Sequence, residues 1–136
     1  MTTMNDRKLE EGMTETDQDA FFRKFEEVWD NYDLEGILEQ FCDDAVYEAS
    51  IGPETWGYRA VGKEAIGLLI KDVFERIPDL RFHDEFKFYS PELAVVEGRQ
   101  TGTLSDGQTF NTSCVDILVM RDGKIAAKRA YRKDHQ

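Results

Sequence analysis

The spacing of apolar residues predicts three helices in the first half of the chain. From residue 17 onward, aromatic and aliphatic side chains recur at three- and four-residue intervals, which places them on one face of a helix. Thr16, followed three residues later by an aspartate, is typical of a capping box at the start of this helix. A second, short helix capped by Asp33 and a third over residues 63–77, ended by Pro78, show the same spacing.

Alternating apolar and polar residues predict strands in most of the remaining chain. One strand is expected at residues 45–51, after a turn at residues 42–44. Phe82, Phe86 and Phe88 are expected to share the inward face of the next strand, because successive side chains of a strand point to opposite faces. Asp-Gly pairs at two later boundaries favour tight antiparallel turns. The later strands are expected at residues 80–89, 93–104, 108–120 and 124–132.

This order of elements indicates the α+β class. Two helices, a strand and a third helix are followed by four strands that can form a meander. Helices that come first and antiparallel strands that come last favour a curved sheet with the helices on one face. Residues 1–15 are mostly polar or small and are expected to form a flexible N-terminal arm, ahead of a single domain at residues 16–134.

The length and net charge of the chain argue against some classes of binding partner. The chain has 136 residues, and 17 Lys and Arg against 28 Asp and Glu give a net charge of −11. This length fits one domain with a core of its own. The negative charge disfavours binding to nucleic acid or to an anionic membrane surface, because both would repel the chain. No apolar run is long enough to span a membrane.

The beginning of the chain and its few metal-binding side chains set further expectations. Residues 1–18 are polar and acidic without an apolar stretch, so we expect no secretory signal and a cytoplasmic protein. Two histidines and two cysteines show no metal-ligand spacing. There is also no glycine-rich nucleotide loop and no serine nucleophile elbow. We therefore expect no cofactor and no metal.

Three segments of the chain resemble one protein family. They are residues 33–47, residues 56–66, and residues 115–125 together with Tyr131. They resemble the SnoaL-like polyketide cyclase and ketosteroid isomerase superfamily, which has the nuclear transport factor two-like fold, over about residues 19–133. The resemblance implies a cone-shaped curved antiparallel sheet packed on three N-terminal helices, a cystatin-like α+β barrel. It also implies an apolar pocket inside the cone and homodimers formed through the outer face of the sheet.

At the positions where this family has its catalytic residues, the chain has only some of the needed side chains. By resemblance to ketosteroid isomerases, the general base falls at Ala49 and the oxyanion-hole tyrosine at Phe25, and neither residue has the needed group. Asp116 falls where those enzymes keep a protonated aspartic acid that donates to the oxyanion. By resemblance to the polyketide cyclases, the acid–base aspartate falls at Ala130 and the histidine at Asp116.

Limonene epoxide hydrolase offers a third comparison. The chain resembles it at Tyr47 and Arg99, but the two aspartates of that enzyme fall at Thr101 and Ala130, and its asparagine falls at Ala49. Without these carboxylates nothing is placed to activate a water molecule. All three known reaction schemes therefore lack at least one essential group in this chain.

The remaining polar residues predict a mixed site inside the cone. We expect Asp116, Tyr47 and Arg99 to be its catalytic residues. Asp116 is either a neutral donor, or the partner of Arg99 in an ion pair that binds a polar or anionic ligand end, or the partner of a lysine. Arg99 could equally face solvent. The expected substrate-binding residues are Trp56, Thr101, Cys114, Phe25, Ala49 and Ala130.

Two functions from different classes remain open. One is an enzyme that binds a small hydrophobic organic molecule in an enclosed pocket and acts on it by proton transfer, as an isomerase, cyclase or lyase. The other is a non-catalytic ligand-binding or dimerisation module of the same fold. The polar set around Asp116 favours the enzyme, whereas the alanines at positions 49 and 130 favour the module.

Overall fold

Three helices and six strands form between residues 15 and 134, the part of the chain that the computed structural model describes. The expected arm at residues 1–15 lies outside this part except for its last residue. The helices are α2 (Asp17–Asp30), α3 (Leu34–Glu39) and α4 (Lys63–Arg76). The strands are β1 (Phe41–Glu48), β2 (Arg59–Val61), β3 (Arg81–Tyr89), β4 (Leu93–Thr103), β5 (Thr109–Arg121) and β6 (Lys124–Arg132).

The first helix begins at the predicted capping box and is pinned to the sheet nearby. The Thr16 side chain accepts from the backbone N–H of Asp19, and the Asp19 carboxylate accepts from that of Thr16. Asp19 is buried, and the Tyr89 hydroxyl of β3 donates to its carboxylate. The Tyr89 ring also stacks on Phe22, with ring centroids 4.7 Å apart. These contacts fix α2 against β3 as well as satisfying its first N–H groups.

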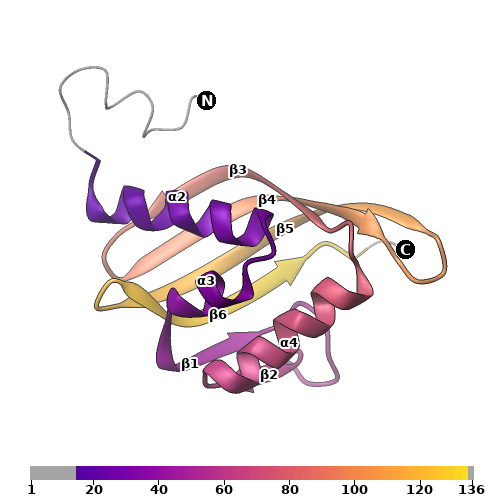
Figure 1. Ribbon diagram of the computed structural model, residues 1–136, viewed down its shortest axis with the longest axis horizontal. Helices are drawn as coiled ribbons and strands as arrows, with labels where there is room; N and C mark the ends of the chain where they lie inside the picture. Colours follow the sequence, from indigo (N-terminus) through magenta and orange to yellow (C-terminus); the bar gives the residue numbers. More distant parts are fainter. Residues whose placement is uncertain (1–14, 135–136) are drawn as a thin grey trace.

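The sheet is curved and unclosed, with the strand order β2-β1-β6-β5-β4-β3. The three helices lie against one of its faces, with α2 on the side of β3 and α4 on the side of β1 and β2 (Figure 1). The α+β class and the curved sheet packed on helices are confirmed. Two details differ from the prediction. β1 and β6 pair in parallel, so the sheet is mixed, and β2 forms inside the expected loop as an edge strand.

The start of β1 differs from the prediction as well. The apolar spacing of the second helix, at Leu34, Ile37 and Leu38, would extend to Phe41, but α3 ends at Glu39 and Phe41 pairs with Ile125 of β6. Residues 42–44, expected to form a turn, are extended within β1. The pairing register between β1 and β6 shifts between Phe41 and Val46, so this part of the strand is irregular. An apolar residue at the border of two elements is compatible with either of them. Here the pairing with β6, which is distant in sequence, makes Phe41 part of the strand.

The hydrophobic core fills the space between the helices and the concave face of the sheet. It is rich in aromatic side chains from α2, which contact one another and the inner side chains of β3. Fully buried members come from every layer: Phe22, Val28, Ile37, Phe41, Ile66, Ile70, Leu118 and Ile125. Burial on this scale is the main term that holds the layers together.

A β-bulge in β3 changes which side chains of that strand face inward. Asp84 pairs with Gly98 of β4 and Phe86 pairs with Glu97, so Glu85 is an extra residue. Phe82 therefore faces the core, whereas Phe86 and Phe88 are 54% and 59% exposed on the outer face. The prediction that the three phenylalanines share the inward face is wrong, because simple alternation does not carry across a bulge.

Candidate functional site

A cavity of about 620 Å³ lies between α2, α4 and the concave face of the sheet. The helices and the start of β3 supply apolar walls, and the strands supply most of the polar groups. The loop after β1 contributes Ser50, Ile51 and Tyr58 at one side. A cavity of this size holds a molecule of two or three fused rings. The apolar walls are Phe25, Trp29, Leu69, Ile70, Val73, Ile77, Leu80 and Phe82.

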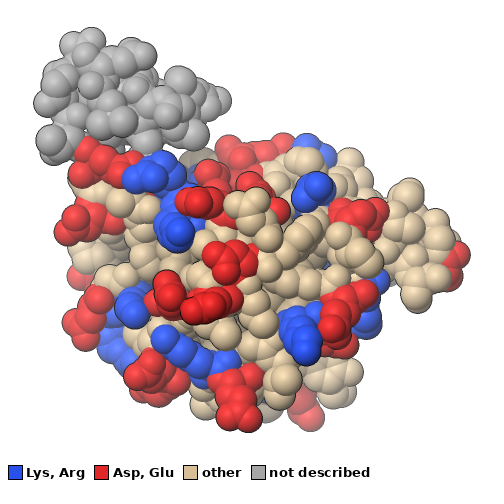
Figure 2. Space-filling view, viewed as in Figure 1, with Lys and Arg blue, Asp and Glu red and all other residues tan. Residues whose placement is uncertain are grey.

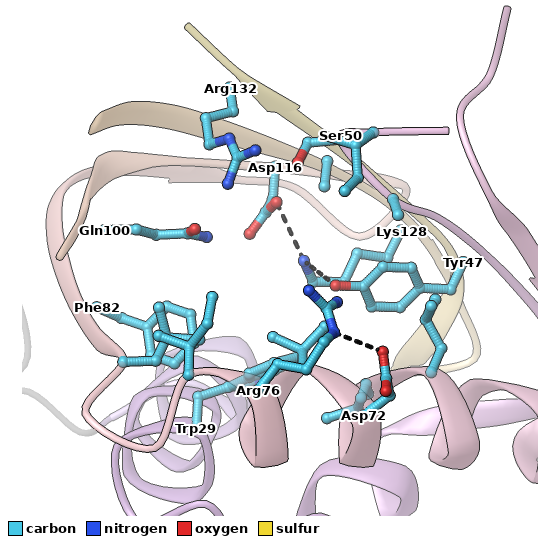
Figure 3. Close-up of a pocket in the computed structure, with 18 of the residues that line it drawn as sticks. Trp29, Tyr47, Ser50, Asp72, Arg76, Phe82, Gln100, Asp116, Lys128 and Arg132 are labelled. Atoms are coloured by element: carbon cyan, nitrogen blue, oxygen red, sulfur yellow. Dashed lines mark hydrogen bonds and ion pairs between the residues drawn. The ribbon is translucent and has the colours of Figure 1, made fainter. Parts of the chain in front are cut away.

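An ion pair between Lys128 of β6 and Asp116 of β5 lies in the wall of this cavity. The Lys128 Nζ is 3.0 Å from Asp116 Oδ1, and the two side chains are only 5% and 19% exposed. Lys128 Nζ also donates to the Tyr47 hydroxyl oxygen of β1 at 3.5 Å (Figure 3). The rings of Trp29 and Tyr47 lie 5.2 and 4.8 Å from the ammonium, within the range of cation–π attraction.

The protonation state of Lys128 follows from its neighbours. Burial by itself lowers the pKa of Lys128, but the charge of Asp116 and the Tyr47 hydroxyl outweigh burial and raise the pKa above its usual value. Lys128 is therefore a cation at neutral pH. Asp116 is in an ion pair with a lysine, which is one of the states that the sequence left open, and is not paired with Arg99.

Arg99 and Thr101 lie on the outer face of the sheet, contrary to the prediction. Arg99 donates to Glu85 at 3.2 Å and to Asn111 at 3.0 Å, and the Thr101 hydroxyl contacts the ring of His83 at 3.1 Å. The inner face of β4 carries Ala94, Val96, Gly98, Gln100 and Gly102 instead, because Val96 pairs with Asp116 and paired residues share a face. Arg99 and Asp116 are on opposite faces, so the site predicted around that pair does not form.

The other predicted contact residues divide into two groups. Phe25, Ala49 and Ala130 line the cavity together with Tyr47 and Asp116. Cys114 lies on the same face of β5 as Asp116 but is not part of the wall, and burial together with the charge of Asp116 raises the pKa of its thiol to about 11. A neutral thiol at this position is a small half-buried side chain and a poor nucleophile.

Trp56 does not line the cavity. Its side chain is 42% exposed on the loop after β1, and the Arg59 guanidinium lies 4.3 Å from the centre of its ring. Arg59 in turn donates to Glu48 at 2.7 Å. Trp56 therefore packs against the neighbouring strand β2 rather than forming the rim of the pocket.

Several polar groups of the cavity were not among the predicted site residues. Gln100 and Arg132 extend toward the same space as Asp116 (Figure 3). Arg76 of α4 also lines the cavity, paired with Asp72 at 2.8 Å. For Gln100 the sequence did contain a signal. The small residues Ala94, Gly98 and Gly102 lie on the same face of β4 as Gln100, and small residues in a strand mark a face that another part of the chain approaches closely.

Asp84 is the carboxylate in this wall whose pKa is moved closest to neutrality. Its side chain is 20% exposed, and burial raises its pKa to about 6, with Lys87 acting against this shift. The charges of Glu26, Asp116 and Asp30 raise it further. Asp84 lines the cavity from β3 just before the bulge, and regular alternation from the inward Phe82 was the sequence signal that could have placed it there.

Between residues 15 and 134 there is no cluster of three or more histidine, cysteine or acidic side chains that could hold a metal ion. None of the helices in that part is long and apolar enough to cross a membrane. Lys and Arg on the helical face are interspersed with Asp and Glu and form no continuous basic surface there (Figure 2).

Comparison with known proteins gives one family and many structures of similar fold. The model of the SnoaL-like domain matches residues 22–128. An NTF2-like protein of unknown function from Burkholderia pseudomallei superposes with a TM-score of 0.77 at 20% identity, over 87% of this chain and 92% of that one. No curated protein matches the sequence significantly.

Two other similar structures contain small molecules. A protein with a ketosteroid isomerase-like fold from Catenulispora acidiphila, in complex with trimethylamine, has a TM-score of 0.71 at 14% identity, over 82% of this chain and 83% of that one. TerC, co-crystallised with polyporic acid, has a TM-score of 0.74 at 20% identity, over 87% of this chain and 92% of that one. At these identities the likeness shows the fold.

Proposed function

The chain belongs to the SnoaL-like domain family, and we propose that it binds a small hydrophobic carbonyl compound in the cavity and catalyses a proton transfer on it, as an isomerase, cyclase or lyase. Two proteins of similar fold were crystallised with small organic molecules, TerC with polyporic acid and the Catenulispora acidiphila protein with trimethylamine. The proposal rests on the site itself, because one fold supports many activities.

The observation that carries the proposal is the position of the buried Lys128–Asp116 ion pair beside the apolar walls of the cavity. Aromatic and aliphatic side chains of α2, α4 and β3 surround most of the 620 Å³ cavity. The Lys128 ammonium, 5% exposed, is held at its wall by Asp116. A flat apolar molecule with one polar oxygen fits this distribution, because the walls bury its rings and the charged group fixes its orientation.

Tyr47 and Lys128 supply the chemistry that such a molecule needs. Lys128 donates to the Tyr47 oxygen, so the Tyr47 hydroxyl hydrogen is left to be donated to a ligand oxygen. When a proton leaves the carbon beside a carbonyl group, negative charge develops on the carbonyl oxygen. A donor polarised by a buried cation stabilises that charge more than it stabilises the neutral ketone, which is the condition for faster reaction. Asp116 orients Lys128 and keeps it protonated.

A non-catalytic ligand-binding module is the second candidate. The specific observation in its favour is that Ala49 and Ala130 line the cavity at the positions where the resemblance places catalytic carboxylates. Binding without turnover would then be the function of the same cavity, so both candidates can be tested with one pair of probes.

Filling the cavity is expected to abolish binding. We expect 2-naphthol, an aromatic analogue of the enol of 2-tetralone, to bind the wild type, and Ala130→Trp to weaken binding by about tenfold or more, because the indole occupies the space of the ligand. Fluorescence titration of 2-naphthol measures the affinity. The matched control is Ala127→Trp on the outer face of the same strand, where Ala127 pairs with Val119.

A second measurement distinguishes the enzyme from the non-catalytic binding module. Deuterium exchange into the position beside the carbonyl group of 2-tetralone, followed by proton NMR in heavy water, reports proton transfer. Binding of 2-naphthol with exchange that exceeds the buffer rate supports the enzyme, and binding without exchange supports the module. Equal affinities of the wild type and Ala130→Trp would contradict both, since the cavity would not be the binding site.

We also propose that the protein forms a homodimer through the outer face of the sheet. Paired residues place an apolar band there across three strands, because Phe88 of β3, Val95 of β4 and Ile117 of β5 lie side by side in register. Phe86 and Tyr131, both exposed, extend the band through Glu97 and Val115 in the next row. A band of large exposed apolar side chains is typical of an interface rather than of a solvated surface.

Charge introduced into this band is expected to give a monomer. Phe88→Glu would place a carboxylate in the proposed interface, where it loses its water without gaining a partner. Light scattering after size-exclusion chromatography measures the mass, and we expect a dimer for the wild type and a monomer for the variant. Leu68→Glu, which alters an exposed apolar residue of α4, serves as the control and should leave the mass unchanged. A monomeric wild type would contradict the proposal.

A further inference from the structure

We propose that Asp84, which lies in the wall of the cavity on the same face of β3 as Phe82, is the general base that removes the proton from the bound carbonyl compound. This assignment rests on the function proposed above. The family resemblance expects the base at position 49, at the end of the first strand, where this chain has an alanine. The proposal places the base on β3 instead.

The backbone is built to bring Asp84 to this position. Asp84 shares the inward face of Phe82 by regular alternation, and the bulge begins directly after it: Asp84 lines the cavity, and Glu85, the extra residue, pairs with Arg99 outside. Asp84 is paired with Gly98, and a Cβ at that glycine would lie 2.1 Å from the backbone oxygen of His83 and 2.9 Å from the Cα of Asp84. Only a glycine allows β3 to approach β4 this closely. Bulges are frequent beside active sites.

Asp84 is also free to accept a proton. Its nearest cation is Lys87, whose Nζ lies 3.9 Å away and has a closer partner in Glu26 of α2. Three other carboxylates of the wall are engaged more tightly, since Asp116 is 3.0 Å from the Lys128 ammonium, Asp72 is 2.8 Å from Arg76 and Glu26 is paired with Lys87. Within residues 15–134 Asp84 has no hydrogen bond from a side chain or backbone N–H, so its lone pairs can reach a ligand.

The charges around Asp84 set its basicity. The ionisable groups that face it are Glu26 and Asp30 from α2, Lys87 from its own strand and Asp116 from β5. Three of these four are negative, and together with burial they raise the pKa of Asp84 to about 6. A base of this strength is mostly ionised at pH 7 and still binds a proton far better than an exposed aspartate does, which suits proton abstraction near neutral pH. His83 cannot take this role, because its ring contacts Thr101 on the outer face.

The proposed step conserves atoms and electrons without a co-reactant. The C–H bond beside the carbonyl group breaks, its proton forms an O–H bond on Asp84, and its electron pair moves through the new C=C bond to the carbonyl oxygen. Tyr47, with Lys128 behind it, donates to that oxygen. Return of the proton to another carbon of the conjugated system shifts the double bond, and exchange on Asp84 with heavy water before return introduces deuterium.

The test separates proton transfer from binding. We expect Asp84→Asn to lower the rate of deuterium exchange into 2-tetralone by about a hundredfold or more, with 2-naphthol affinity kept within about twofold. Glu85→Gln alters the neighbouring carboxylate on the outer face and should keep both. The wild-type rate should rise with pH through an apparent pKa of about 6, and this rise should be absent in Asp84→Asn.

Stability against pH shows that Asp84→Asn folds and that the carboxylate is buried. The pKa of Asp84 is higher in the folded chain than in the unfolded chain, so the folded state binds the proton more tightly. The stability that this proton contributes is fully present below about pH 4. It is lost as the pH rises through about 6. Urea unfolding should show this decline for the wild type and a smaller one for Asp84→Asn.

Different results overturn different claims. If the wild type exchanges deuterium and Asp84→Asn is as fast, Asp84 is not the base and the proposed function stands. If Asp30→Asn and not Asp84→Asn abolishes exchange, the base is Asp30, which lines the same cavity and whose pKa burial also raises. If the wild type binds 2-naphthol and exchanges no deuterium, proton transfer and the role of Asp84 both fail.

Discussion

Replacing Lys128 by methionine is expected to lower the free energy of unfolding at pH 7 by about 3 kcal/mol. Methionine fills much of the volume of the lysine but leaves Asp116, 19% exposed, without its cation. The carboxylate then loses hydration on folding with nothing to compensate for it, which is the costly way to break a buried ion pair. Urea unfolding monitored by circular dichroism measures the change, and it should shrink in acid, where protonation removes the unpaired charge.

A double variant separates the missing partner from the lost packing. Lys128→Met combined with Asp116→Leu removes both charges, and we expect it to recover most of the stability, because a well-packed apolar pair is often as stable as a buried ion pair. Asp116→Leu alone should be destabilising, since it leaves the buried Lys128 ammonium without its counter-ion. A double variant as unstable as Lys128→Met would contradict this account. Its deuterium exchange should stay lost even if it is stable, because the cation behind Tyr47 is gone.

Gly98→Ala is expected to cost about 2 kcal/mol or more and to abolish proton transfer. The added methyl group would lie 2.1 Å from the backbone oxygen of His83, and a backbone atom cannot move aside as the end of a side chain can. β3 must shift away from β4, and Asp84 shifts with it. Thermal or urea unfolding measures the first effect, and deuterium exchange into 2-tetralone measures the second.

The same substitution at Gly67 of α4 is the control. There the nearest atom to the added methyl is Cδ1 of Leu38 at 3.1 Å, which belongs to a partly exposed and flexible side chain. Alanine favours the helix over glycine by up to about 1 kcal/mol, so we expect no loss of stability and a small gain. If Gly98→Ala were as stable as the wild type, the close approach of β3 and β4 would not be needed for the bulge.

The local pattern predicted those parts of the fold that depend on neighbouring residues. The spacing of apolar residues placed α2 and α4 within a few residues of their observed ends, and the capping box at Thr16 and Asp19 forms as predicted. The boundary at Phe41 was missed because a single apolar residue fits the end of a helix and the start of a strand equally well.

The candidate site was predicted in part. Asp116, Tyr47 and Ala130 were assigned to the inner face and line the cavity, because β1, β5 and β6 alternate regularly near their inward residues. Arg99 was assigned to the same face by mistake. Both faces of β4 carry residues that could be buried, so alternation along that strand does not tell which one faces inward. Only its pairing with β5 does so.

The sequence by itself therefore determined the class of fold and the helices, which follow from local periodicity, and its resemblance to a known family indicated the family and an apolar pocket. The tertiary structure decided the chemistry of the site. It joined Lys128 to Asp116 rather than Arg99 to Asp116, and a bulge after Asp84 turned Phe86 and Phe88 outward. The physical reason is that ion pairs and strand faces depend on the register between strands distant in sequence, and one extra residue reverses every side chain beyond it.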